Sequence, residues 1–201
     1  MASSSELYAV QFNWTLYSWQ VPPTRGPGER AGLSRDLVLD AATGLLTERG
    51  AVTMRAVAQR LGVAPNALYS HVADKTELVD GVLDRVLAQV EAPRAGSDPV
   101  AALHRMMSST HEVLLRHPQL VPAFLARQGA RGPNAQHLGA VALENLAAAG
   151  VTGAAAREAL RVLIVYAIGF AAFDGERPLP GIELRGTFER GLDWLLTGIV
   201  G

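Results

Sequence analysis

The chain has 201 residues, which is long enough for one large domain or two small ones that bury an apolar core without disulfides or metals. It contains no cysteine, so disulfide frameworks, thiolate metal sites and cysteine nucleophiles are excluded, and this composition fits the reducing cytoplasm. The formal net charge of −1 gives no general sign of nucleic-acid binding, and no apolar stretch approaches the roughly 20 residues of a membrane-spanning helix.

The first 32 residues form an N-terminal extension that differs in composition from the rest of the chain. Large apolar residues alternate with smaller or polar ones over residues 8–16, a period of two that suits a short strand or an extended arm. A stretch rich in proline and glycine follows and separates this part from the predicted helices. The extension is either a disordered tail or an arm that packs on a partner surface or precedes a nucleic-acid contact.

Two helices are predicted directly after the extension, each bounded by a capping residue and a glycine. Ser34 can cap the first helix, which ends at Gly50, and Thr53 can cap a second, shorter helix, which ends at Gly62. The apolar residues of each segment recur at helical spacing, so each helix can bury one face. These positions are Leu37, Val38, Ala41, Leu45 and Leu46 in the first helix, and Val57, Ala58 and Leu61 in the second.

A third and a fourth helix follow. Pro65 suits the first position of a helix, because its missing N–H would be unpaired there, and we expect this helix to end near Val72. Asp74 and Glu77 have the spacing of a capping box and open the fourth helix, whose apolar side continues to Val90.

The stretch after the fourth helix, APRAGSDP, interrupts the helical pattern and marks the expected boundary between two domains. The first domain then spans residues 33–92 and the second spans residues 93–201. The pattern beyond the boundary is again helical and nothing in it indicates a sheet, so the expected fold class is all-α. The helices of the second domain are expected at residues 99–117, 119–129, 134–149, 153–173 and 185–200.

The spacing over residues 53–75 is that of a helix-turn-helix, a motif in which the second helix lies in the major groove of DNA. The turn needs a residue that tolerates positive φ, and Gly62 supplies it. Val63, Leu68 and Val72 can then hold the two short helices at a fixed angle. The residues expected to face outward from the second helix are small or polar, which leaves room for a close approach to DNA.

The local distribution of charge supports this interpretation. Between Arg49 and Lys75 there are four basic residues and one acid, Asp74. Arg55 can contact a guanine edge bidentately or hold a phosphate, and Lys75 at the start of the fourth helix makes a natural phosphate seat. The alternative is that Arg55, Arg60 and Lys75 form an ordinary solvated face.

Residues 33–90 resemble the N-terminal domain of the tetracycline-repressor (TetR) family, and RLGVAPNALYSHVADKTEL is similar to its recognition-helix signature. One departure is Ala64, which stands where family members frequently have a Ser or Thr cap worth about 1 kcal/mol. The resemblance, together with the outward positions of the motif, implies a set of DNA contacts. These are Thr53, Arg55, Pro65, Asn66, Ala67, Tyr69, Ser70, His71 and Lys75.

The resemblance further implies that the second domain forms a homodimer through its last two long helices and encloses a ligand pocket. Small residues in helix 153–173 allow another helix to approach closely, and two such helices from each subunit would form a four-helix bundle. The alternative is that these faces belong to the core of a single chain. The expected interface residues are Ala155, Ala159, Leu163, Phe188, Leu192, Leu195 and Ile199.

Candidate ligand-binding residues in the second domain follow from helical spacing and side-chain chemistry. His104 and His111 share one face of helix 99–117, where they could bind a metal or a polar ligand group, or fill structural positions. The string that begins at His111 is not a zincin motif, because Leu115 occupies the place of the second histidine. The candidates are His104, Met107, His111, Leu114, Phe124, Gln128, Tyr166 and Phe170, and no resident metal or cofactor is expected.

No Walker loop, dinucleotide fingerprint or nucleophile elbow is present, so the sequence does not indicate an enzyme. The resemblance implies a transcriptional repressor that binds a palindromic DNA operator as a dimer and is released by a small-molecule effector, without a membrane partner. Two alternatives stay open. One is an activator with the same DNA reader, and the other is a helical small-molecule-binding protein or small enzyme that keeps the first domain only as a fold element.

Overall fold

The computed structural model describes residues 32–93, 96, 98–127, 131–176 and 184–201. Every regular element in these ranges is a helix, which confirms the expected all-α fold class. The helices lie in one compact unit, Ser34–Gly201, and none of those described is both long enough and apolar enough to cross a bilayer. The strand or arm considered for residues 8–16 lies outside the described residues, and the division into domains at residues 92 and 93 stays a prediction.

Four helical elements begin the compact unit, and their N-caps are those that the sequence predicts. They are α1 (Arg35–Arg49), α2 (Met54–Leu61), the 3₁₀ helix η1 (Pro65–Ser70) and α3 (Lys75–Leu87). The caps of the three α-helices accept backbone N–H groups at 2.8–3.2 Å: Ser34 from Leu37, Thr53 from Ala56, and Asp74 from Glu77. Because these bonds are local, the sequence alone locates the start of each helix.

Two of these helices end earlier than the sequence predicts. The third is a 3₁₀ helix that ends at Ser70 rather than near Val72, and its N-cap Ala64 gives no side-chain hydrogen bond, as expected for alanine. The fourth, α3, ends at Leu87, although Val90 is buried. Val90 instead belongs to a tight turn after α3, in which its N–H donates to Leu87 O at 3.0 Å.

The remaining elements are α4 (Pro99–Arg116), the 3₁₀ helix η2 (Pro118–Leu120), α5 (Val121–Arg127), α6 (Pro133–Ala148), α7 (Gly153–Glu176) and α8 (Leu184–Val200). Most bounds agree with the prediction within one or two residues, and α7 continues three residues further. The segment expected as one helix at 119–129 is instead divided into η2 and α5, because the break at His117 and Pro118 starts a separate turn before Val121.

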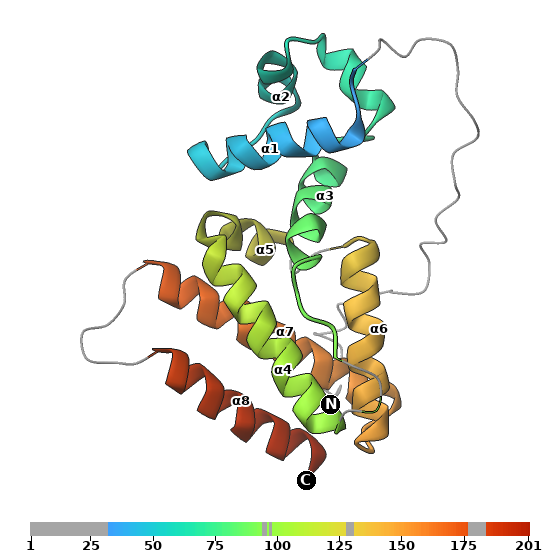
Figure 1. The fold of residues 1–201 in the computed structure, drawn as a ribbon, viewed down its shortest axis with the longest axis vertical. Helices are drawn as coiled ribbons and strands as arrows, with labels where there is room; N and C mark the ends of the chain where they lie inside the picture. Colours follow the sequence, from blue (N-terminus) through green and yellow to red (C-terminus); the bar gives the residue numbers. More distant parts are fainter. Residues whose placement is uncertain (1–31, 94–95, 97, 128–130, 177–183) are drawn as a thin grey trace, which may run out of the picture. The chain divides into compact units, whose positions relative to one another are not determined.

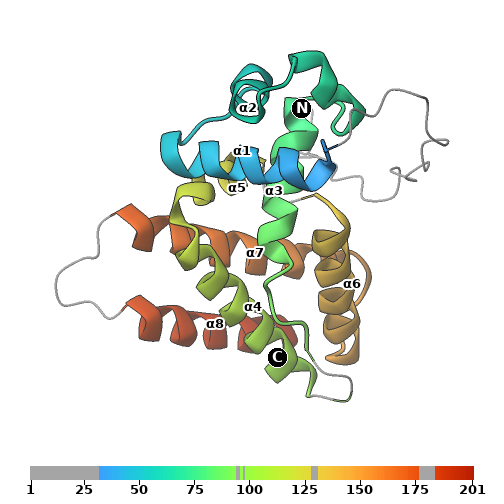
Figure 2. The ribbon, with the colours of Figure 1, turned by 45° about the horizontal axis from the view of Figure 1, so that its top comes forward.

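We call α1, α2 and η1 the head and α4 to α8 the body. Figures 1 and 2 show α3 leaving the head and running along the body beside α5 and α6. In the body, α4 packs against α6, α7 and α8, and α7 also packs against α8. The core is closed by large side chains with almost no exposed surface, among them Leu68, Leu78, Leu114, Phe124 and Phe188.

Two glycines with open space around them can be compared to test the positive φ of the turn after α2. Gly62 has φ of +65° after α2, whereas Gly139 lies inside α6, and no atom stands within 4 Å of a Cβ added at either position. We expect Gly62→Ala to lower the free energy of unfolding by about 1 kcal/mol, because alanine is strained at positive φ. We expect Gly139→Ala to raise it by about 0.5 kcal/mol, because alanine favours a helix interior. Urea denaturation measures both, and equal effects would contradict the left-handed turn.

Candidate DNA interface and ligand region

The corner between α2 and η1 is fixed by backbone hydrogen bonds and by burial. The Val63 N–H donates to Ala58 O at 3.0 Å, and the Gly62 N–H donates to Gln59 O at 3.2 Å, the bond pattern of a glycine-terminated helix. Leu68 and Val57 are completely buried beneath the corner. The two short helices are therefore held at one angle, as the helix-turn-helix spacing predicts.

The predicted DNA-contact residues lie on the outer surface of this corner. Tyr69 is 53% exposed, and Asn66 is also exposed, so neither side chain turns into the protein interior. Two hydroxyls already take part in local hydrogen bonds: Thr53 accepts from Ala56 N, and Ser70 donates to Ala67 O at 2.8 Å. The other exposed members of the set are Arg55, Pro65 and Lys75, and Ala67 and His71 are half-buried.

The basic residues of the head differ in whether an acidic side chain pairs with them. Arg60 donates to both carboxylate oxygens of Glu48 in α1, at 2.6 and 3.0 Å, and its guanidinium lies over Gly44. The hydrogen bonds of this pair raise the pKa of Arg60 and lower the pKa of Glu48. Arg60 therefore joins α2 to α1, which the sequence did not indicate. Arg55 and Lys75 are exposed and have no acidic partner in the described part of the chain.

The start of α3 is tied to the head immediately after η1. The predicted capping box forms in part: the Glu77 N–H donates to Asp74 at 2.8 Å, but Glu77 accepts the N–H of Ala73, at 2.6 Å, in place of that of the N-cap Asp74. Arg35 of α1 pairs with the same Glu77 at 3.1 Å. Lys75 is the first residue of α3, so its ammonium group lies at a helix N-terminus that faces solvent.

Several candidate ligand residues meet in the body around Phe188. The buried ring of His111 stacks on Phe188 with centroids 4.0 Å apart, and Phe170 lies edge-on to Phe188 at 5.5 Å. Tyr166 donates its hydroxyl to Phe188 O at 2.9 Å, and burial, followed by the charge of Glu189, raises the pKa of this phenol. Met107, Leu114 and Phe124 are buried as well, whereas Gln128 lies outside the described residues.

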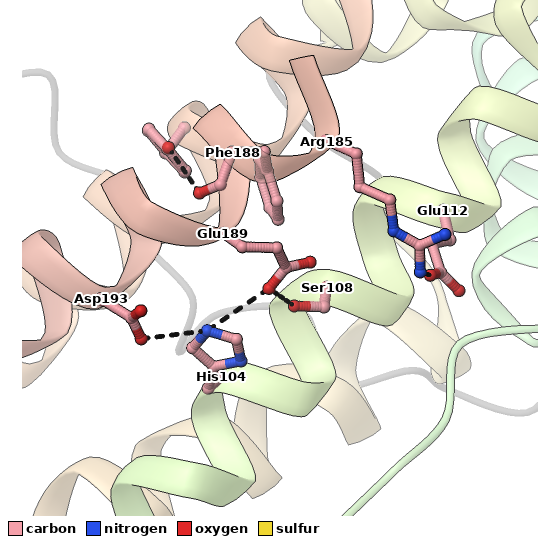
Figure 3. A network of polar contacts seen from close by, with 8 residues as sticks. His104, Ser108, Glu112, Arg185, Phe188, Glu189 and Asp193 are labelled. Atoms are coloured by element: carbon pink, nitrogen blue, oxygen red, sulfur yellow. Dashed lines mark hydrogen bonds and ion pairs between the residues drawn. The ribbon is translucent and has the colours of Figure 1, made fainter. Parts of the chain in front are cut away.

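His104 lies apart from this aromatic cluster, in a polar cleft between α4 and α8. Its Nε2 is 3.4 Å from Glu189 and 3.2 Å from Asp193, and Ser108 donates to Glu189 at 2.9 Å (Figure 3). The cleft has a volume of about 260 Å³ and is lined by Glu91, His104, Arg105, Ser108, Ser109, Glu112, Arg185 and Glu189. The sequence did not indicate the two acids of α8, because only the packing of α8 on α4 brings them to the histidine.

The expected interface residues divide between the interior and the surface of the single chain. Leu163, Phe188 and Leu192 are completely buried within the chain itself, and Ala159 is nearly so. Ala155 is exposed, and Leu195 and Ile199 are half-buried. The strongly exposed apolar residues of α7 and α8 are different ones, namely Val162, Val165, Phe173 and Trp194.

Known proteins share both the sequence of the head and the fold of the whole unit. The family model for bacterial regulatory proteins of the tetR family matches residues 38–82. The transcriptional repressor DrrR1 of Streptomyces coeruleorubidus is 37% identical over 109 residues, which are 52% of this chain and 40% of DrrR1. The crystal structure of BioQ from Mycobacterium smegmatis is 28% identical, with a TM-score of 0.73 over 84% of this chain and 98% of BioQ. The head therefore matches the TetR family in sequence, and the whole unit matches known structures in fold.

ActR from Streptomyces coelicolor, a TetR-family protein whose structure is known without ligand, has the same fold. It is 24% identical, with a TM-score of 0.73 over 85% of this chain and 98% of ActR. The sequence match to DrrR1 spans less than half of that repressor's length, whereas the structural matches cover nearly all of BioQ and ActR. The TetR-like fold therefore extends beyond the helix-turn-helix into the body.

Arg55 and Arg60 lie in the same short helix, so substituting each in turn tests which of the two arginines contacts DNA. We expect Arg55→Ala to weaken DNA binding by roughly tenfold or more and to reduce the slope of log affinity against log salt by about 1, because a phosphate or base contact is lost.

We expect Arg60→Ala to leave that salt slope unchanged and to lower thermal stability slightly, because this arginine contacts Glu48. Fluorescence anisotropy over a range of salt concentrations measures both variants. A lower slope for Arg60→Ala with an unchanged slope for Arg55→Ala would reverse the assignment.

Proposed function

We propose that this chain is a ligand-responsive transcriptional repressor that reads a palindromic DNA operator as a homodimer in the cytoplasm. The observation that carries the proposal is the outward presentation of η1 and Arg55 on a helix-turn-helix whose sequence matches the TetR-family model. BioQ, which is 28% identical to this chain, has a structure with its natural double-stranded DNA operator. A regulator agrees better with these relatives than an enzyme does.

The DNA contacts fall into two groups according to their chemistry. Arg55, Tyr69 and Lys75 carry exposed polar or charged groups that reach phosphates or base edges. The tip of η1 has small side chains, among them Pro65 and Asn66, and these allow the backbone to approach the groove closely. The complete proposed set is Thr53, Arg55, Pro65, Asn66, Ala67, Tyr69, Ser70, His71 and Lys75.

The proposed dimer forms through the exposed apolar face of α7 and α8. Val162, Val165 and Phe173 lie on one side of α7 at helical spacing, and Trp194 of α8 is 73% exposed. Apolar side chains of this size and number rarely stay in contact with water, and a two-fold arrangement of the two helices would cover them. In this proposal Leu163, Phe188 and Leu192 hold the two helices in the chain, and the exposed residues contact the partner.

The ligand is proposed to bind in the body, next to the aromatic cluster of His111, Tyr166 and Phe170. ActR, which shares the fold, has been crystallised in complex with actinorhodin, so a protein of this fold can bind a small molecule. Stacked rings and a buried imidazole suit an aromatic ligand with polar substituents. The ligand would release DNA to the extent that it binds better to an arrangement of the heads that does not fit the operator.

The first test is DNA binding. A gel shift with the DNA that precedes the chain's own gene is expected to show one specific complex, and footprinting should find two half-sites about one helical repeat apart. A thermal-shift screen of small molecules then gives candidate ligands, and a true effector both stabilises the protein and releases the DNA. If selection from sheared genomic DNA retrieves no specific fragment, the regulator assignment fails.

The second test is the dimer. We expect Val165→Glu, at a site that is 64% exposed, to weaken dimerisation by at least about tenfold, because a charge enters an apolar interface. Leu125→Glu places the same charge at an exposed apolar site on α5, and this control is expected to leave the dimer intact. Sedimentation equilibrium measures both, and a Val165→Glu dimer as tight as the parent would contradict the proposed interface.

A further inference from the structure

We infer that Asp80 and Asp84 of α3 form a clasp on the body, and that this clasp sets the orientation in which the head meets DNA. The inference rests on the proposed function, because it assigns positioning residues to the proposed DNA reader. Neither carboxylate belongs to the DNA-contact set or to the ligand candidates. Both lie on the part of α3 that runs along α5 and α6 (Figure 1).

Asp84 acts as the N-terminal cap of a different helix. It is only 5% exposed, and its carboxylate accepts the backbone N–H groups of Asn134 at 3.3 Å and Ala135 at 2.9 Å. The Asn134 side-chain amide donates to it as well, at 2.9 Å. The N-cap position of α6 is occupied by Gly132, which has no side chain to offer, so the first turn of α6 takes its acceptor from α3.

The fit between Asp84 and α6 is close and depends on Gly132. A Cβ added to Gly132 would lie 2.4 Å from Asp84 Cγ, well inside contact distance. The backbone of Gly132 is extended, so the requirement for glycine comes from space and not from conformation. A negative charge at a helix N-terminus is also favoured by the helix dipole. Helix α3 therefore contacts α6 in one register.

Asp80 makes the second half of the clasp, one helical turn before Asp84. Arg127, the last residue of α5, donates to its two oxygens, each at 2.8 Å, and the Asp80 side chain is largely buried. This hydrogen bonding raises the pKa of Arg127. A two-point ion pair constrains direction as well as distance. The C-terminal end of α5 and the N-terminal end of α6 are thus both attached to the same face of α3.

Helix α3 is also attached to the head. Arg85 pairs with Asp40 of α1 at 2.9 Å, Glu77 pairs with Arg35, and Leu78 is completely buried. The clasp therefore acts on the head through α3. The head also contacts the body directly, because α1 packs against η2, and Gln119 of η2 donates to Thr47 of α1 at 3.4 Å in an exposed position.

An intrachain distance measurement tests the clasp without reference to DNA. The chain has no cysteine, so nitroxide labels attach only at Gln59→Cys on exposed α2 and Ala140→Cys on exposed α6. Labelled chain is diluted into an excess of unlabelled chain, so that each measured pair lies within one protomer. We expect one narrow distance in the parent and a broader or shifted distribution in Asp84→Asn, whose amide cannot accept all three donors.

Two further variants separate positioning from loss of folding. Gly132→Ala should change the distance in the same direction as Asp84→Asn, because the added methyl group displaces the carboxylate. Glu144→Gln removes a charge from an exposed position on α6 and should leave the distance unchanged. Should Asp84→Asn fold poorly by circular dichroism, Asp80→Asn replaces it. Folded clasp variants with the parent's distance distribution would overturn the inference.

Operator binding then distinguishes failure of the clasp from failure of the proposed function. We expect Asp84→Asn to lower operator affinity by about tenfold, in the range typical of coupling between sites, and to keep the parent's salt slope. It should also discriminate less between operators whose half-site spacing differs by one base pair. A parent that binds no DNA refutes the proposed function, and the distance measurement still decides the clasp. A parent and variant with equal affinity and equal spacing preference overturn the clasp.

Discussion

Helix α3 packs against α1 of the head and against α5 and α6 of the body. The rest of the structure depends on how its side chains are divided between these two groups of helices. Leu78 and Leu83 are completely buried, Glu77 and Arg85 pair with α1, and Asp84 faces the start of α6. A buried carboxylate is costly unless all its acceptor positions are used, so only one placement of α3 on α6 is favourable. In the proposed clasp, the position of the head is therefore set through a helix, in addition to the contact of α1 with η2.

The body uses its apolar residues in two different ways. The inward sides of α7 and α8 are closed by the aromatic cluster around Phe188, which needs no second chain. The outward sides still carry Phe173 and Trp194. A protomer with a complete core and an exposed apolar face can fold first and associate afterwards, so association does not have to supply the stability of the fold.

The features predicted correctly from sequence are those that depend on neighbours in the chain. Ser34, Thr53 and Asp74 were identified as caps because the bonds they make span three residues. The residues facing outward on α7 could not be chosen, because this helix is apolar around most of its circumference and only packing shows which side is covered. His104 was grouped with His111 for the same reason, since helical spacing does not show that α8 supplies acids to one and a phenylalanine to the other.

The clasp spans about 50 positions of the chain, from Asp84 to Asn134, and no local pattern connects two residues so far apart. Two signals were nevertheless present in the sequence: an acid between the apolar residues Leu83 and Val86, and a helix predicted at 134–149 whose preceding residues, Gly132 and Pro133, offer no capping side chain. Each is unremarkable alone. Only the fold shows that the carboxylate of Asp84 accepts the backbone N–H groups at the start of α6.

The ion pair between Arg60 and Glu48 has a consequence for how the protein would search for its site. An arginine that is paired with a carboxylate attracts the phosphate backbone less than an unpaired one does, so the general attraction of the head for DNA depends mainly on exposed residues such as Arg55 and Lys75. Because it depends on these exposed charges, affinity for DNA of arbitrary sequence would fall as salt is added, and sliding along the duplex would shorten with it.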